Sequence, residues 1–413
     1  MKKNLLKKVT SLALAGALTL GLAACGGASG SAPAAGGSAP EEAASNSADF
    51  KKSKIAVCVY EDSTEFSKGM QDYFKKLGEA MNVEIVIGLY SMMDEAANIE
   101  TTTQLISSGV DGIIGTTDVG TSTIIDECEA AGVYYASYLN DLNASFAMDH
   151  DHVFNNEYFL GAIADGYTSD SDALGDLYFD SLIQYNETHA DAPLTHVAFT
   201  VFPAFSHPQQ TASAMKFAGL VEEYNKTAET PITVDPLDEN VDVLQFASLD
   251  ETYFSKHADI DAIICFADGG SFVYPTMVSA GVDTSIKLFT AGFNDSLEAN
   301  FGSNGTQTLQ QVMGSPFEGI IYPLVLMVNK LNGVEFADQP EQAERISSSL
   351  FVANSDESMK QMMNSLYVTY DASKGLITPE TIVDLTAVAN PDATYAGLVE
   401  KAQSFSLDQV TVE

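Results

Sequence analysis

The sequence lacks tryptophan and contains a single arginine, Arg345. Its 19 Lys and Arg residues are outnumbered by 57 Asp and Glu residues, which gives a formal net charge of −38. Phosphate binding needs clustered basic side chains, so nucleic acid is a poor partner for this chain. The same acidic excess repels anionic lipid headgroups and keeps the molecule soluble, but it does not identify a ligand.

Cysteines and catalytic motifs are also scarce. Besides Cys25 the chain contains Cys58, Cys128 and Cys265, an odd number without the C-x-x-C spacing of a zinc site. We expect these three thiols to be buried and free. No GxSxG, HExxH or P-loop motif occurs, and no GxGxxG motif lies between a strand and a helix. The sequence therefore predicts neither an enzyme nor a bound cofactor.

The N-terminus has the features of a secretory signal. Lysines at positions 2, 3, 7 and 8 precede an apolar run over residues 9–20, which is too short to span a bilayer as a mature helix. The sequence Leu-Ala-Ala before Cys25 resembles the bacterial lipobox. The resemblance implies that a lipoprotein signal peptide, residues 1–24, is removed and that Cys25 carries acyl chains such as palmitate. An ordinary cleavable signal followed by a chance cysteine is the alternative.

Residues 25–50 are rich in Ala, Gly, Ser and Pro and have little apolar surface to bury, so they predict a flexible linker. The chain from Lys51 onward is long enough for two domains of ordinary size. No later segment is apolar for long enough to cross a membrane.

From Lys54 onward, strand-like and helical patterns alternate. Strands are predicted over residues 54–60, 83–87, 111–115 and 133–138, with helices over 66–81, 94–108 and 121–131 between them. Strands and helices that alternate at this length are typical of βαβ units in an open parallel sheet.

The alternation restarts after residue 151. Further strands are predicted over residues 196–201, 232–234, 261–266, 287–292 and 306–313. Further helices are predicted over residues 155–168, 211–224, 243–257, 267–280, 296–301 and 318–331. The sequence therefore predicts one α/β architecture used twice in series.

The order of these segments resembles the type I periplasmic-binding-protein family, in particular the ribose/galactose-like sugar-binding lipoproteins of ABC importers. The resemblance rests on three stretches, which read KIAVCVYEDSTEFSKGMQDYFKKLG, TTTQLISSGVDGIIGTTDVGTSTIIDECEAAGVYYAS and DAIICFADGGSFVYPTMVSAG, the last followed by IKLFTAGFND. It covers roughly residues 54–334. It implies two Rossmann-like lobes, each a parallel sheet flanked by helices, which are joined by a crossover hinge and close on a ligand.

On this resemblance we expect an N-terminal lobe of residues 51–150 plus about 313–345, and a C-terminal lobe of residues 151–312 plus about 346–390. Residues 391–413 are expected to form a C-terminal tail. Met359, Met362 and Met363 follow helical spacing in a segment beyond the usual length of the family. We expect these methionines to pack in a core against the second lobe.

The resemblance also implies ligand contacts at the ends of the strands, where carboxylates and amides pair with hydroxyls and aromatic faces cover C–H surfaces. The candidate residues are Thr64, Phe66, Asp118, Asn140 and Asp141 in the first lobe, and Phe205, His207, Gln209, Asp268 and Asn294 in the second.

Several of these residues have a purely structural alternative. Asp118 and Asp141 are also suited to cap the helices that follow them. Phe66 is equally suited to anchor the start of a helix. His207 and Asn294 are also typical turn residues.

The chain departs from its sugar-binding relatives in three places. Thr211-Ala212-Ser213 stands where these relatives often carry an arginine, tryptophan is missing, and the late pair reads Ala267-Asp268 rather than Asn-Asp. A nucleoside, a modified sugar or another small polar metabolite is therefore an alternative ligand to a simple sugar.

The segment Asp149-His150-Asp151-His152 has the residue types of a metal site. On a strand its two histidines would share one face and its aspartates the other. A solvated crossover between the lobes is the simpler interpretation, so we expect no metal there, and metal binding is the alternative.

The sequence thus predicts an extracytoplasmic solute-binding protein, lipid-anchored to the bacterial cell membrane, that passes a small polar ligand, most simply a sugar, to ABC permease subunits. A ligand-sensing lipoprotein that signals to a membrane receptor is the first alternative. An enzyme on the same scaffold is the second, and the missing pairing of a nucleophile with a base speaks against it.

Overall fold

The computed structural model describes residues 49–140, 142, 146, 148–166, 170–293, 297–301 and 307–412. The expected signal peptide, the linker up to residue 48, and the candidate residues Cys25, Asp141 and Asn294 lie outside this described part. Within it, no helix combines the length and the apolar character needed to cross a membrane.

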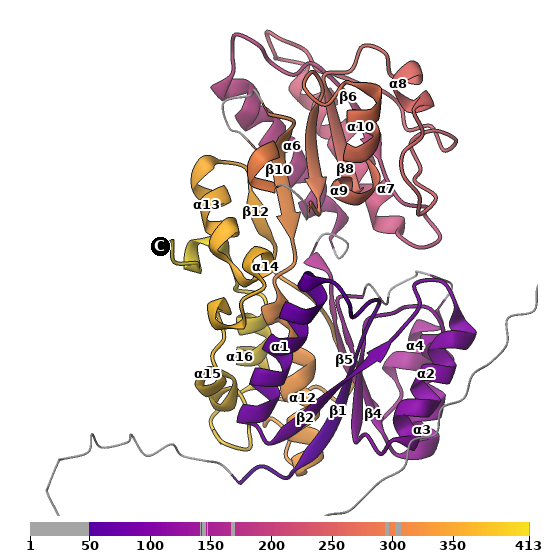
Figure 1. The fold of residues 1–413 in the computed structure, drawn as a ribbon, viewed down its shortest axis with the longest axis vertical. Coiled ribbons are helices and arrows are strands. Elements are labelled where there is room, and N and C mark those ends of the chain that lie inside the picture. Colours follow the sequence, from indigo (N-terminus) through magenta and orange to yellow (C-terminus); the bar gives the residue numbers. More distant parts are fainter. Residues whose placement is uncertain are drawn as a thin grey trace, which may run out of the picture. The chain divides into compact units, whose positions relative to one another are not determined.

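The first lobe is built on a six-stranded sheet with the order β11-β5-β4-β3-β1-β2, in which every neighbouring pair is parallel (Figure 1). Its strands are β1 (Ser53–Val59), β2 (Val83–Leu89), β3 (Gly112–Gly115), β4 (Tyr134–Tyr138), β5 (Phe159–Ala164) and β11 (Arg345–Ser347). Its connecting helices are α1 (Glu65–Ala80), α2 (Glu95–Ser107), α3 (Thr121–Ala131) and α4 (His150–Phe154).

Helices cover both faces of this sheet, which explains why its strands are continuous apolar runs. Ile55 and Val57 of β1 pack in one cluster with Phe74 of α1. The alternate residue Ala56 packs in a second cluster with Ile124 of α3. Side chains alternate along a strand, so the two clusters lie on opposite faces of the sheet.

The second lobe is built on a six-stranded sheet with the order β12-β10-β9-β8-β6-β7, in which only β12 runs antiparallel to its neighbour. Its strands are β6 (His196–Thr200), β7 (Thr233–Val234), β8 (Ala262–Asp268), β9 (Lys287–Ala291), β10 (Leu309–Gly314) and β12 (Phe351–Ala353). Its helices are α6 (Ser171–Thr188), α7 (Pro208–Tyr224), α8 (Thr252–Lys256), α9 (Gly269–Phe272), α10 (Tyr274–Ala280) and α11 (Leu297–Asn300). The predicted α/β fold with two lobes is confirmed.

The chain passes between the two sheets at three places: after β5, where residues 165 and 166 are described, at residues 315–316 after β10, and at residues 348–350 between β11 and β12. Two of these crossings are bonded to each other. The Ser315 hydroxyl donates to the Asp165 carboxylate and accepts from the backbone N–H of Gly166 at 3.1 Å. These segments are the crossover hinge that the sequence predicts.

The predicted boundary between the lobes at residue 150 is wrong. Residues 155–168 were predicted as a helix, but Phe159–Ala164 form β5 of the first sheet. A short apolar run does not distinguish a strand from a buried helix. Tertiary pairing selects the strand here, because Phe159–Ala164 pair with β4 and β11. The predicted helix over 243–257 is also wrong, since only Thr252–Lys256 are helical there.

The C-terminal part of the chain is not a separate tail. Helix α13 (Asp356–Asn364) packs on β12, and its Met359 and Met362 are buried, as expected. The next elements then return to the first lobe, which corrects the assignment of residues 346–390 to the second. Those elements are α14 (Leu366–Thr369), η3 (Ala372–Lys374) and α15 (Pro379–Asp384) beside α1, and α16 (Tyr395–Ala402) beside α12 (Ile321–Asn332).

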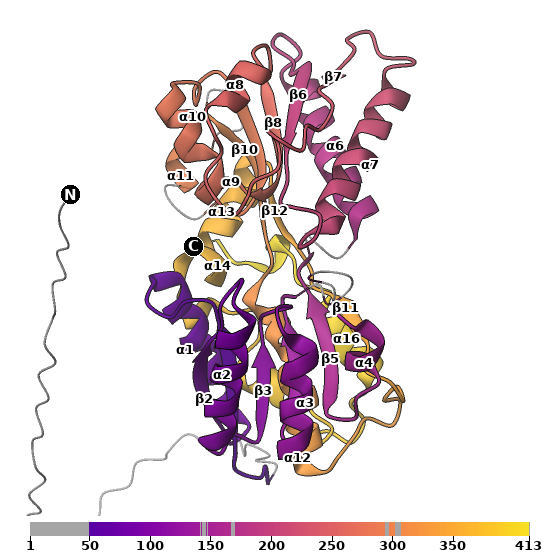
Figure 2. The same ribbon diagram turned by 90° about the vertical axis from the view of Figure 1, so that its right-hand side faces the viewer.

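We call residues 354–412 the C-terminal extension. In Figure 2 its helix α16 lies behind the first sheet near β11, whereas its helix α13 lies beside the second lobe. The Tyr395 hydroxyl donates to Glu344 at 2.8 Å and lies 2.8 Å from the Tyr322 hydroxyl. The last turn, η4 (Leu407–Gln409), returns to α13 and β12 of the second lobe. The extension therefore contacts both lobes.

Cys58, Cys128 and Cys265 are buried and free, as expected. Burial raises the pKa of the Cys265 thiol to about 11 and that of the Cys58 thiol to about 12. Both therefore stay protonated and unreactive at neutral pH.

Replacing Leu398 of α16 by alanine tests whether the extension belongs to the core. Leu398 is 1% exposed, so Leu398→Ala should lower the free energy of unfolding by about 2–5 kcal/mol. The neighbouring exposed Glu400→Ala should change it by no more than about 0.5 kcal/mol. Urea unfolding measures both, and equal stability of the two variants would contradict a packed extension.

Candidate functional site

Parallel strands bring their carboxyl ends to one edge of a sheet, and the loops that follow them are where open α/β sheets bind ligands. The described candidate residues all follow such ends: Thr64 and Phe66 after β1, Asp118 after β3, Asn140 after β4, Phe205, His207 and Gln209 after β6, and Asp268 at the end of β8.

Thr64 and Phe66 serve the start of α1. The exposed Thr64 accepts a hydrogen bond from the Ser67 N–H at 3.1 Å and donates to the Glu61 carboxylate, so it is the N-cap. The Phe66 ring meets Phe317 and Tyr370 edge to face, with centroids 5.1 and 5.8 Å apart. The anchoring alternative thus describes Phe66 well, and its contact with a ligand stays a prediction.

Asp118 and Asn140 lie at the edge of the first sheet. The capping alternative for Asp118 is wrong, because α3 has Gly120 as its N-cap and no side-chain cap. Asp118 is only partly buried, whereas Asn140 is buried and donates to Ser137 Oγ at 2.9 Å and to the Gly115 carbonyl at 3.4 Å. Asn140 therefore fixes the ends of β3 and β4 beside Asp118.

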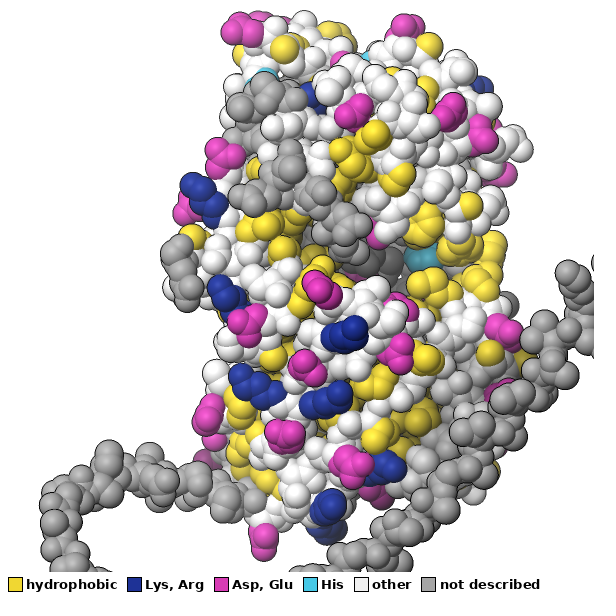
Figure 3. Space-filling view, viewed as in Figure 1, with side chains coloured by type: hydrophobic (Ala, Val, Ile, Leu, Met, Phe, Trp, Pro, Cys, Tyr) yellow, Lys and Arg dark blue, Asp and Glu magenta, His cyan; other side chains and the backbone are white. Residues whose placement is uncertain are grey.

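Aromatic rings gather after β6. We define the aromatic cluster as Phe146, Phe202, Phe205, His207, Phe246 and Phe272. Phe202 stacks on Phe246 at 5.0 Å and meets Phe272 edge to face at 5.2 Å. Hydrophobic side chains also surround a histidine at mid-height in Figure 3. Of this cluster the sequence predicted only Phe205 and His207 as site residues.

One ring of the aromatic cluster comes from the first lobe. The Phe146 N–H donates to the Phe205 carbonyl at 2.9 Å, and the two rings lie 5.9 Å apart, edge to face. The Phe205 side chain nevertheless remains 55% exposed. The loops after β4 and β6 therefore meet here, and an aromatic face stays open to solvent.

His207 and Gln209 carry the polar groups beside these rings. Burial lowers the pKa of His207 to about 4, so its imidazole is neutral at neutral pH, and its Nδ1 lies 2.9 Å from Ser206 Oγ. The Gln209 Oε1 atom is buried and accepts no hydrogen bond from the described residues. Because a buried acceptor without a partner is costly, a ligand donor there would be stabilising.

Asp268 ends β8 and caps α9, accepting from the Ser271 N–H at 3.0 Å and the Ser271 hydroxyl at 2.8 Å. Burial raises the pKa of this carboxyl group, although these hydrogen bonds oppose the shift. Gly292 follows β9 with φ +69°, and a Cβ atom there would lie 2.9 Å from Asp268 Cγ. A glycine is therefore needed beside the carboxylate.

The sequence missed the hinge side of this edge. Asp165 and Ser315 are bonded to each other at the ends of β5 and β10, and Tyr367 of α14 lies against Gly314. Asp165 fell in a segment predicted as helical, and Tyr367 belongs to the extension, to which the sequence assigned no role in the site. Neither carries a sequence pattern that would have revealed its place.

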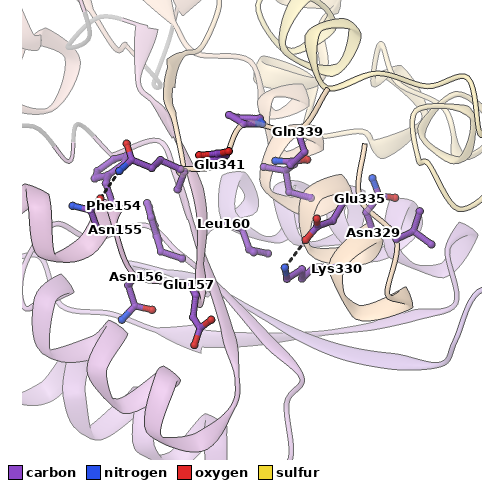
Figure 4. A pocket seen from close by; sticks show the side chains of 16 residues that line it. Phe154, Asn155, Asn156, Glu157, Leu160, Asn329, Lys330, Glu335, Gln339 and Glu341 are labelled. Atoms are coloured by element: carbon purple, nitrogen blue, oxygen red, sulfur yellow. Dashed lines mark hydrogen bonds and ion pairs between the residues drawn. The ribbon is translucent and has the colours of Figure 1, made fainter. Parts of the chain in front are cut away.

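A cavity of about 370 Å³ lies elsewhere in the first lobe, beside the amino end of β5 (Figure 4). Two pairs of its polar side chains are bonded to each other: Lys330 Nζ lies 2.5 Å from Glu335, and Gln342 donates to Asn155 at 2.6 Å. It is remote from the carboxyl ends of the strands, so we do not assign the site to it.

The segment 149–152 is not a crossover, which corrects the prediction. It begins α4 within the first lobe, where Asp149 caps the helix and His152 lies 2.8 Å from Asp126. Across the described residues, no group of three or more His, Cys, Asp or Glu side chains is arranged to hold a metal ion.

A partly buried charge network supports the loop that carries Phe246. The two ring nitrogens of His257 lie 2.6 Å from Asp235 and 2.7 Å from Asp242. His196 lies 2.7 Å from the other oxygen of Asp235. Burial opposes protonation of His257, but the hydrogen bonds to Asp242 and Asp235 outweigh it and raise its pKa. A charged His257 thus joins both ends of residues 235–242, the segment that leads to Phe246.

Stability should therefore fall as this imidazolium loses its proton. The raised pKa means that its contribution is complete below the unfolded value of about 6.5 and is lost as pH rises through the folded pKa. The stability difference between wild type and His257→Gln should be largest at pH 6 and smaller at pH 9, measured by urea unfolding.

Tyr253→Phe is the control for this experiment, since its ring packs on His257 and its hydroxyl donates to the Phe199 carbonyl at 3.0 Å. Burial keeps the pKa of Tyr253 well above 10. Removing its hydroxyl should therefore lower the free energy of unfolding by the same amount at both pH values. If the stability difference between wild type and His257→Gln does not change with pH, that result would contradict a charged His257.

No family model matches the sequence, and no curated protein sequence matches it. Many solved structures are similar in fold. A sugar ABC transport system substrate-binding protein from Bordetella parapertussis has a TM-score of 0.56 at 13% identity, over 78% of this chain and 93% of that one. An ABC transporter periplasmic solute binding protein from Actinobacillus succinogenes with bound D-allose gives 0.53 at 15% identity, over 74% and 99% of the two chains. A periplasmic ribose ABC transporter from Conexibacter woesei has a TM-score of 0.51 at 13% identity, over 79% of this chain and 98% of that one.

Proposed function

Because this chain has the fold of the type I periplasmic binding proteins, we propose that it is an extracytoplasmic solute-binding protein of an ABC importer that holds a small uncharged polar solute, most simply a sugar, between its lobes. The observation that carries this proposal is the convergence of polar and aromatic side chains at the carboxyl edges of both sheets. The contact of Phe146 with Phe205 brings the two edges together. Nothing in the proposal requires catalysis.

The charges at these edges favour an uncharged or cationic solute. Asp118, Asp165 and Asp268 are carboxylates, and His207 is neutral at neutral pH. None of the described residues in the loops that follow β1 to β10 at this edge is Lys or Arg. A phosphate or carboxylate ligand would find no positive partner here, and burying an unpaired charge is costly. Carboxylates and amides instead suit hydroxyl groups, which both donate and accept.

The aromatic cluster supports two ligand classes. The exposed ring of Phe205 offers a face that can cover the C–H surface of a sugar. The same rings can stack on a base, so a nucleoside is the second candidate. The solved structure from Actinobacillus succinogenes holds D-allose, which favours the sugar as the first compound to test.

A binding experiment tests the proposal. D-Ribose, D-allose, D-arabinose, adenosine and single amino acids would be added in a thermal-shift screen, followed by calorimetry. A true ligand at a hundred times its Kd should stabilise the protein by ~2.7 kcal/mol. Stabilisation by a sugar or by adenosine supports the proposal. If no compound in the panel stabilises the protein, the proposal is contradicted.

Asp268→Asn links any binding to the site. Asparagine can still cap α9 but loses the carboxylate, so the Kd of the bound compound should rise about tenfold. Asp149→Asn is the matched control, because Asp149 caps α4 in the same way, accepting from the His152 N–H at 3.1 Å. If both variants bind like wild type, the solute is not held at Asp268.

The anchor and the membrane partner belong to the same proposal. We infer that the signal peptide ends at Ala24, that Cys25 is acylated and that the lipid holds the protein outside the cytoplasmic membrane, where closed lobes would dock on a permease. A signalling role with a membrane receptor is the alternative. Cross-linking distinguishes the two roles. On our proposal it should recover an ABC permease rather than a receptor.

Cys25→Ser tests the anchor. In a bacterial host the wild-type chain should incorporate labelled palmitate and sediment with membranes, because two acyl chains are enough for stable anchoring. The variant should lose both properties. Labelling that persists in Cys25→Ser would contradict acylation at this residue.

A further inference from the structure

The C-terminal extension reaches the ligand-binding edge at Tyr367 of α14. Its ring packs against Phe66 and Phe317, with centroids 6.3 and 5.8 Å apart. The hydroxyl end lies against Gly314, where an added Cβ atom would be 2.3 Å from Tyr367 Cζ and 2.5 Å from its oxygen. Only a glycine at the end of β10 leaves room for this ring.

The surroundings of Gly314 place this hydroxyl at a corner of the site. The next residue, Ser315, is bonded to Asp165 at the end of β5. On the other side, the Gly292 N–H donates to the Met313 carbonyl at 2.9 Å, and Gly292 packs on Asp268. The ends of β5, β8, β9 and β10 thus converge beside Tyr367.

The Tyr367 hydroxyl differs from the hydroxyls of most buried tyrosines, although the buried Tyr135 hydroxyl likewise has no hydrogen-bond partner among the described residues. Those of Tyr73, Tyr138, Tyr178 and Tyr253 donate to backbone carbonyls at 2.6–3.2 Å. No hydrogen bond joins the Tyr367 hydroxyl to another of the described residues, although its side chain is only partly exposed. Burial, and after it the carboxylates of Asp268 and Asp165, raises its pKa, so the group stays a protonated donor.

We propose that Tyr367 is a specificity-determining residue of the binding site, whose hydroxyl hydrogen-bonds an oxygen of the solute beside Asp268 while its ring closes the hinge side of the site. This inference rests on the proposed function and adds to it a ligand contact supplied by the C-terminal extension. An unpaired donor beside two carboxylates selects a solute with a hydroxyl or ring oxygen at that position.

The extension holds the ring in place from both sides. Before Tyr367, α13 packs on β12 of the second lobe. After it, the Leu376 N–H donates to the buried Glu318 carboxylate at 2.8 Å, and the Tyr73 hydroxyl donates to the Ile377 carbonyl at 3.1 Å in the first lobe. A side chain fixed in this way contributes a preorganised contact.

Tyr367→Phe tests the inference because it removes the hydroxyl and keeps the ring. The probe is whichever of D-ribose, D-allose, D-arabinose and adenosine binds the wild-type protein most tightly, together with its monodeoxy analogues. The variant should bind the probe about 5- to 10-fold more weakly, and it should discriminate less than wild type against at least one deoxy analogue. Its urea unfolding should match that of wild type.

Tyr224→Phe is the control, since its ring packs on Phe179 in the second lobe and its hydroxyl is outside the site. It should bind every compound like wild type. Unchanged affinity and discrimination in Tyr367→Phe would overturn the inference and leave the proposed function standing. Equal weakening toward every analogue together with lower stability would also overturn it. If no probe binds the wild type, the proposed function fails, and this inference fails with it.

Discussion

The account depends on one constraint: parallel strands present all their carboxyl ends at a single edge of a sheet. In this chain that constraint acts twice, because both sheets are parallel apart from β12. It brings side chains from distant parts of the sequence to two short edges. The bonded pair Asp165 and Ser315, at the ends of β5 and β10, ties two of the crossings between the lobes together at these edges.

What the sequence lacks shapes the chemistry of these edges. With a single arginine and no tryptophan in the chain, the proposed site relies on carboxylates, amides and phenylalanine rings. Burial keeps His207 neutral, so it does not offset the acidic groups. A solute held here must bring donors for the carboxylates and an apolar face for the rings. A sugar has both, and a nucleoside has both in a different proportion.

The sequence predicted the repeated α/β architecture well, because continuous apolar runs such as β1 and β8 can only be buried in a covered sheet. It failed at β5, whose short apolar run fits equally well in a helix until its pairing with β4 and β11 is known. It also failed for the extension, whose elements are short and whose partners, α1 and α12, are remote in sequence.

For similar reasons, only part of the proposed site could be read from the sequence. Residues directly after a strand, such as Asp118 and Asp268, can be read from the strand itself. Phe246 and Tyr367 cannot, because their places depend on a charge network and on a tertiary contact with Gly314. Local pattern carries no information about such contacts.

A crystal structure of the protein grown with the tightest-binding sugar of the panel tests the central claim most directly. The account predicts electron density for the sugar between the strand ends of the two lobes, within hydrogen-bond distance of Asp268 and against the ring of Phe205. Density in the cavity beside Lys330 and Glu335, with the strand ends empty, would contradict it.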